Sequence, residues 1–152
     1  MGFTAEAVEL FKDDTEKMKS LINKRCIDDS LKSLRTRARS TPSIIMTNGL
    51  PQTLAFVISK SNNELYSNLS EQREFKKEIE INSDEAGYTA YLYVVINFLY
   101  NNKLIKCKPK NLKEAVEVVK ELDDDPRQAS VVQNVLIDFL LEFKKISEAL
   151  IR

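Results

Sequence analysis

The stretch TPSIIMTNGLPQTLAFVISK, residues 41–60, decides between a helical fold and one that contains β-structure. Its Asn48-Gly49 pair lies between apolar runs, which is the usual signature of a tight β-hairpin turn. After the glycine, however, the apolar residues recur at spacings of three and four, as on one face of a helix: Leu50, Leu54, Val57 and Ile58. Pro51 would also remove a ladder hydrogen bond where the second strand of a hairpin begins. We therefore predict helices on both sides of the glycine.

The same stretch suggests where those helices begin and end. Thr41-Pro42 is typical of an N-cap followed by the first position of a helix. Gly49 is expected either to end a helix or to allow two helices to approach closely, and Pro51 to start or kink the next one.

The rest of the chain is also dominated by helical periodicity and capping signals. Thr4 is a candidate cap for a first helix. Residues 26–38 then either form a separate helix capped by Asp28 or Asp29, or continue the first one. Residues 64–79 are expected to form a polar surface helix with three side chains inward: Leu65, Leu69 and Phe75.

Three further helix starts are predicted from local pairs. Asn82 with Glu85 and Asn111 with Glu114 resemble capping boxes, and Asp125-Pro126 is typical of the start of a last helix. We predict one all-α domain over residues 1–152, a compact bundle of about six or seven helices.

Bulk composition excludes several classes of protein. The 152 residues carry 23 basic and 23 acidic side chains, so net charge predicts no particular partner. The N-terminus has no features of a secretion signal, and the longest uncharged run, residues 86–102, is too short and too polar for a membrane span. We expect a buried helix there and a cytoplasmic protein that does not bind membranes. Cys26 and Cys107 are expected to be free buried thiols, with a disulfide as the alternative.

Catalytic signatures are missing from the sequence. The chain has no histidine, the usual general base, and no phosphate-binding glycine loop. Asp123-Asp124-Asp125 is the one acidic cluster that suggests a metal, but three consecutive side chains point in different directions and Asp125 is already a predicted cap. We therefore expect a structural loop there, and neither metal, cofactor nor enzymatic activity.

Basic residues are more informative. At 100° per residue, four of them fall within an arc of about 80° on the second helical segment: Arg25, Lys32, Arg35 and Arg39. The apolar residues of the segment lie on roughly the opposite side, while Arg37 points elsewhere and Asp28 dilutes the basic arc. The alternative interpretation is an ordinary solvated face.

Other charged and aromatic features are weaker. Five lysines between residues 103 and 113 precede an acidic stretch, residues 114–125, which suits a helix junction or a subunit that stacks on its neighbour through opposite charges. The tyrosines could stack on bases, but we interpret them as packing or interface residues: Tyr66, Tyr88, Tyr91, Tyr93 and Tyr100.

The opening stretch also carries a family resemblance. Basic residues followed by Pro42, an apolar run, the sequence NGLxQTLAF and Ser59-Lys60 resemble the small α-helical subunit of type III-B (Cmr) CRISPR RNA-targeting complexes. The match covers residues 24–60, and Pro51 takes a place often filled by a small or polar residue. The motif positions are Pro42, Asn48, Gly49, Leu50, Gln52, Thr53, Leu54 and Phe56.

The resemblance implies a non-catalytic subunit. Such a subunit would stack with copies of itself in the minor filament, beside a Cas10-type large subunit, while a separate backbone subunit cleaves the target. It would face the groove where guide RNA pairs with target RNA. The residues expected to contact RNA phosphates are Arg25, Lys32, Arg35, Arg37, Arg39 and Lys60. The motif would serve packing, with Gly49 allowing close helix approach and Leu50, Leu54 and Phe56 at least partly buried.

Two other functions remain open at this point. One is a helical adaptor whose basic face binds an acidic protein partner. The other is a metal-dependent nuclease that uses residues 123–125.

Overall fold

Seven α-helices make up the part of the chain that the computed structural model describes, residues 2–71 and 78–151. They are α1 (Thr4–Leu21), α2 (Ile27–Asn48), α3 (Leu50–Ser59), α4 (Asn63–Ser70), α5 (Ser83–Asn101), α6 (Leu112–Asp124) and α7 (Pro126–Leu150). The described residues form no β-strand, only an isolated parallel bridge between Ile22 and Ile79. The predicted all-α fold is confirmed.

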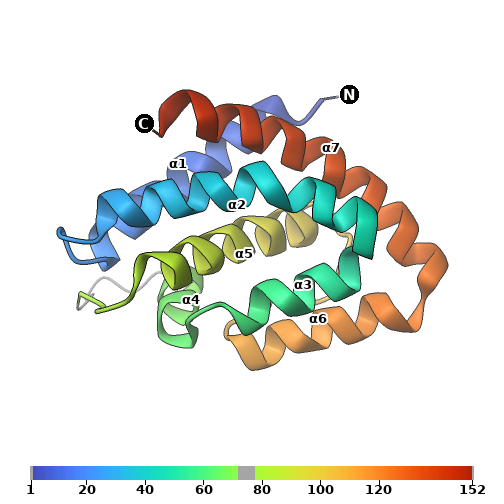
Figure 1. Cartoon of the computed structure of the whole chain (residues 1–152). Coiled ribbons are helices and arrows are strands. Elements are labelled where there is room, and N and C mark those ends of the chain that lie inside the picture. The colour runs from blue at the N-terminus through green and yellow to red at the C-terminus, as the bar shows by residue number, and fades with distance from the viewer. Residues whose placement is uncertain (1, 72–77, 152) are drawn as a thin grey trace.

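The central element is α5, which lies between α2 on one side and α3 and α4 on the other (Figure 1). Thirteen of its residues are buried, and they lie on every side of the helix. A helix that is apolar all round needs partners all round. Accordingly, α5 contacts five other helices: α1, α2, α3, α4 and α7. The β-branched run Val94-Val95-Ile96, which would also suit a strand, fills the core from this helix.

Helix starts follow the capping signals of the sequence. The predicted caps of α5, α6 and α7 each accept a hydrogen bond from the backbone N–H three residues later, at 2.8 Å for Asn82, 2.9 Å for Asn111 and 3.2 Å for Asp125. Asn62 caps α4 in the same way, at 2.9 Å. These bonds satisfy amide groups that the first turn leaves without partners.

Other predicted caps are wrong. Thr4 is the first residue of α1 rather than its cap, and α2 starts after Cys26 without a side-chain cap, so neither Asp28 nor Asp29 serves as one. Thr41-Pro42 does not start a helix either, because α2 continues through both residues to Asn48. A proline inside a helix removes one backbone hydrogen bond. Here Thr41 and Pro42 are buried with the core side of α2, and this burial offsets the loss.

The junction between α2 and α3 depends on Gly49. Its φ of +88° lies in the region that L side chains avoid, and its N–H closes the last turn of α2 on the Ile45 carbonyl at 2.8 Å. A Cβ at this position would meet no atom within 4 Å, so the expected close helix approach is wrong and the terminus interpretation is confirmed. Pro51 lies at the start of α3, as predicted. The Leu50 N–H donates to Gln133 Oε1 at 2.9 Å and ties the junction to α7.

The remaining motif residues divide between core and surface. Leu50, Thr53 and Leu54 are buried, as a packing role requires. Phe56 was expected to be at least partly buried, and it is 46% exposed. Its position on α3 points away from the buried face of that helix.

The expected helix over residues 64–79 is shorter in the structure. The described part, α4, ends at Ser70, and Ile79 is extended, with its N–H donating to the Leu21 carbonyl at 2.7 Å. Phe75 lies outside the described residues. Cys26 and Cys107 are both free, but Cys26 is only partly buried and Cys107 is exposed, which corrects the expectation of buried thiols.

The tightest helix contact is between α2 and α5. A Cβ added to Gly87 would lie 2.0 Å from Ser33 Oγ, 2.5 Å from Ser33 Cβ and 2.8 Å from the Ser33 backbone carbon. Rotation of the serine side chain relieves only the first of these clashes. Gly87 is therefore the residue that lets the two backbones lie this close.

We expect Gly87→Ala to lower the free energy of unfolding by roughly 1–3 kcal/mol, the usual cost of overpacking a core. The sign is informative because alanine favours an isolated helix over glycine by about 1 kcal/mol. Urea unfolding of the two proteins measures the difference. A second variant, Gly87→Ala with Ser33→Gly, should recover part of the loss. Unchanged or higher stability of Gly87→Ala would contradict the close contact.

Asp14 on α1 is an acid within the core. It is fully buried, and neither of its carboxylate oxygens has a hydrogen-bond partner among the described residues. Burial, and secondarily the charge of Asp13, raises the pKa of Asp14 well above its usual range. Burial therefore favours the neutral, protonated form of this side chain in the folded protein.

We expect Asp14→Asn to be more stable than wild type at pH 7. Above the ordinary carboxyl pKa of about 3.9, the unfolded chain releases the Asp14 proton while the folded chain keeps it, so stability falls as pH rises. The amide has no proton to lose. Its advantage should therefore grow as the pH rises above the ordinary carboxyl pKa.

Chemical unfolding measured from pH 3.5 to pH 8 tests this expectation. The advantage of Asp14→Asn should shrink on acidification and vanish near pH 4. Asp29→Asn, the same substitution at an exposed position on α2, is the control. A destabilised Asp14→Asn at pH 7 would show that the buried carboxylate is charged and stabilising.

Candidate nucleic-acid interface

The predicted basic face of α2 is divided in the structure. Arg25, just before the helix, and Lys32 are both exposed, and their charged groups form no ion pair or hydrogen bond with the described residues. Lys60, after the last residue of α3, is exposed as well. These three side chains are available to an anionic ligand.

Arg35 and Arg39 are engaged by the C-terminal part of the chain. Arg35 is half-buried, and its Nη1 donates to the Ile151 carbonyl at 2.9 Å. Arg39 Nε lies 3.0 Å from Glu148 Oε1. Both contacts join α2 to the end of α7, which runs alongside it (Figure 1). Neither guanidinium is an unpaired cation, although Arg39 is exposed.

Arg37 points to another side of α2, as predicted, and takes part in a cluster from three helices. Its guanidinium lies over the ring of Tyr88 on α5, 4.4 Å from the ring centre, and donates to the Tyr88 hydroxyl. Tyr88 meets Phe56 of α3 edge to face, with ring centres 6.0 Å apart. Lys60 Nζ lies 5.7 Å from the centre of the Phe56 ring. We call these four residues the aromatic–cation cluster.

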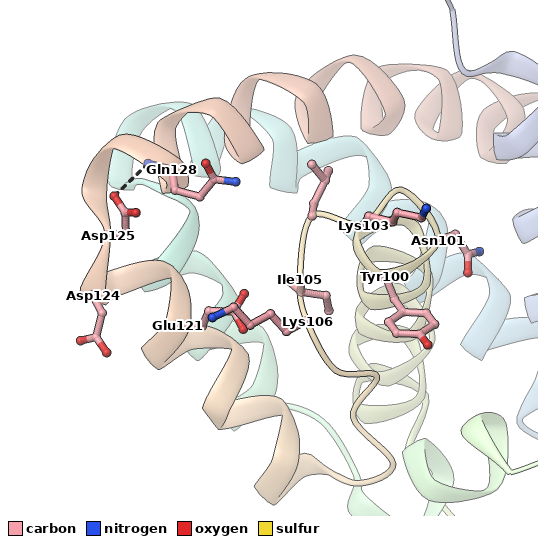
Figure 2. A pocket seen from close by; sticks show the side chains of 10 residues that line it. Tyr100, Asn101, Lys103, Ile105, Lys106, Glu121, Asp124, Asp125 and Gln128 are labelled. Atoms are coloured by element: carbon pink, nitrogen blue, oxygen red, sulfur yellow. Dashed lines mark hydrogen bonds between the residues drawn. The ribbon is translucent and has the colours of Figure 1, made fainter.

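A wide groove lies elsewhere, between the loop after α5 and the corner where α6 meets α7 (Figure 2). Its volume is about 1010 Å³. Tyr100, Lys103 and Lys106 line one side, and Glu121 and Asp124 line the other (Figure 2). The lining carries charges of both signs and contains no paired base and nucleophile. The lysine-rich run that starts at Lys103 lies largely between α5 and α6. It forms a helix junction, which was one of the two interpretations of this run.

The acidic cluster at residues 123–125 does not form a metal site. Asp123 and Asp124 are the last residues of α6 rather than part of a loop, all three side chains are exposed, and Asp125 caps α7. Across residues 2–71 and 78–151, no three acidic or cysteine side chains are placed to hold a metal ion. The nuclease alternative therefore has no structural support. None of the helices in that same part of the chain is long and apolar enough to cross a membrane.

Comparison with known proteins shows the family of this chain. The family model described as CRISPR-associated protein (Cas_Cmr5) matches residues 9–150. The chain belongs to the Cmr5 family. The CRISPR system CMR subunit Cmr5 of Saccharolobus solfataricus is 31% identical over 127 residues, which cover 77% of this chain and 78% of that protein.

A solved structure shares the fold. A chain in the cryo-EM structure of the type III-B Cmr-beta complex bound to non-cognate target RNA matches with a TM-score of 0.72 and 22% identity. The match covers 100% of this Cmr5-family chain and 97% of the other. The resemblance inferred from residues 24–60 is thus confirmed at the level of family and fold.

Sequence reasoning missed the pairing of Tyr88 with Arg37 and Phe56. No local sequence feature indicates the contact between Arg37 and Tyr88, which are 51 positions apart. One part of the cluster was readable, because Phe56 and Lys60 are four residues apart and helical spacing gives them a common face.

We expect Arg35 and Arg39 to differ in their effect on stability. Arg35→Gln should lower the free energy of unfolding by about 1.5–3 kcal/mol, because it removes a charged hydrogen bond to a partly buried carbonyl. Arg39→Gln should change it by less than about 1 kcal/mol, since its partner is exposed. Urea unfolding compares the two. Equal effects would mean that the Arg35 contact does not hold α2 to the C-terminal end.

Proposed function

We propose that this chain is the non-catalytic small subunit of a type III-B Cmr effector complex in CRISPR defence, and that it contacts the backbone of guide and target RNA. The family match over residues 9–150 is the observation that carries the proposal. The CMR subunit from Saccharolobus solfataricus, similar over most of both chains, supports the same role. On this proposal the protein acts in the cytoplasm.

The contact with RNA is assigned to the accessible cations. Arg25, Lys32 and Lys60 can approach phosphates directly. Arg39 can exchange Glu148 for a phosphate at little cost, because an exposed ion pair contributes little to stability. Phosphate contacts hold a strand without reading its sequence, which suits a complex in which pairing with the guide supplies specificity.

Arg35 and Arg37 have a different role in this proposal. Arg35 fixes α2 to the C-terminal end, and Arg37 fixes Tyr88. Both keep the cationic side of α2 in place, and they reach RNA only where their remaining N–H groups are open to it.

Protein partners complete the proposal. The chain stacks with neighbouring copies of itself beside a Cas10-type large subunit, and a different, backbone subunit cleaves the target. Opposite charges on the lysine-rich junction, residues 103–113, and on α6 support stacking between copies.

We expect the full chain to bind single-stranded RNA with an affinity that falls steeply with salt. In Arg25→Gln with Lys32→Gln, the log–log slope should become shallower by about 0.7 for each phosphate that is no longer neutralised. Fluorescence anisotropy with labelled RNA, from 50 to 300 mM salt, measures the slopes.

Lys120→Gln is the matched control, an exposed lysine on α6, and should leave the slope unchanged. An interaction insensitive to salt, or one equally weakened by the control, would reject the RNA contact at α2. Binding to an acidic protein in its place would favour the adaptor.

A further inference from the structure

The aromatic–cation cluster gives Phe56 a setting that an ordinary exposed apolar residue lacks. Single exposed apolar side chains are common and need no explanation. Phe56, however, is 46% exposed while it packs edge to face on Tyr88 and lies under the ammonium of Lys60. Phe56 is thus an exposed aromatic side chain with a cation over its ring.

The residues that support the Phe56 ring are themselves held in place. Tyr88 is held from its face and at its hydroxyl by Arg37. The preceding residue, Gly87, lies against Ser33 in the close contact between α5 and α2. Phe56 itself follows the buried Thr53 and Leu54 on α3. A ring fixed in this way loses little conformational entropy when a ligand stacks on it.

The charge around Phe56 favours an anionic ligand. Helix α3 carries no acidic residue, and the side chain that follows it is Lys60. The carboxylates one turn before Tyr88 on α5 are Asp84 and Glu85. Asp84 is exposed, whereas the Glu85 oxygens accept hydrogen bonds from the side-chain amides of Asn82 at 2.8 Å and Asn62 at 3.4 Å.

We infer that Phe56 is a stacking platform for one unpaired base of bound RNA, with Lys60 at the phosphate of the same nucleotide. Surfaces that bind single strands combine an aromatic ring for the base with a cation for the backbone, and the stack tolerates any base. The inference rests on the proposed RNA contact. It adds a site for a nucleotide of the bound RNA that is not paired in the guide–target duplex. A duplex keeps its bases stacked on one another, so the platform acts on single-stranded RNA.

The first experiment measures RNA binding by the full chain and by the assembled complex, for wild type, Phe56→Leu and Phe56→Trp. Loss of the ring in Phe56→Leu should weaken binding of single-stranded RNA about ten-fold, within the range known for base–aromatic stacking, and should leave the salt slope unchanged. Phe56→Trp should keep the affinity. Binding of a duplex of the same sequence should not change.

The control is Tyr100→Leu, which removes an aromatic side chain of similar exposure, 41%, at the groove of Figure 2. It should bind as wild type does. Lys60→Gln should weaken binding and make the salt slope shallower by about 0.7, because it removes a phosphate contact and not a stack.

A second readout detects the stack directly. A 2-aminopurine placed in the target strand should lose fluorescence on binding to wild type and to Phe56→Trp, and recover it in Phe56→Leu. Urea unfolding of each variant shows that the fold is unchanged.

The outcomes separate the two proposals. If the α2 variants weaken binding but Phe56→Leu does not, phosphate contacts stand and the platform is wrong. If neither the chain nor the complex depends on any of these residues for RNA binding, both are wrong. If Phe56→Leu blocks entry of the chain into the complex and leaves RNA binding by the free chain intact, Phe56 contacts a protein subunit and the platform is again wrong.

Discussion

The contact between α2 and α5 at Ser33 and Gly87 is the constraint on which the rest of the molecule depends. A helix buried on every side, as α5 is, must be enclosed by its neighbours, and the closest of them is α2. Close approach of the two backbones brings Arg37 over Tyr88 and, through Tyr88, gives Phe56 its support. A larger residue at position 87 would push α2 outward, together with the cations on its far side.

Three helix starts were predictable from a cap and a partner three residues later. Asn82, Asn111 and Asp125 act locally, so the sequence contains everything that their hydrogen bonds require. Thr41-Pro42 shows where local reading fails. The pair has the chemistry of a helix start, but its burial against the core is a tertiary effect that keeps α2 continuous, and no neighbouring residue signals it.

Candidate site residues were less predictable than the fold. Periodicity gives the direction of a side chain from the helix axis, and it placed Arg37 correctly apart from the other basic residues of α2. Periodicity does not reveal which distant residues of the chain contact that side chain. The partners of Arg35 and Arg39 come from positions more than 100 residues away, at Ile151 and Glu148. Only the tertiary structure could show that half of the predicted cationic row is already engaged.

On the proposed RNA contact, the engaged arginines would act as supports for α2 rather than as its main phosphate ligands. A protein without net charge gains little long-range attraction for RNA, so its contacts must be arranged in advance. Arginines tied to Ile151 and Tyr88 lose their mobility on folding rather than on binding, and they hold in place the helix that carries Lys32. On the proposed RNA contact, the side chains of Arg25, Lys32 and Lys60 would meet phosphates from a helix that is already held in place. Since each lysine or arginine that must be ordered on binding reduces the affinity gained, a few positioned cations are more effective than many mobile ones.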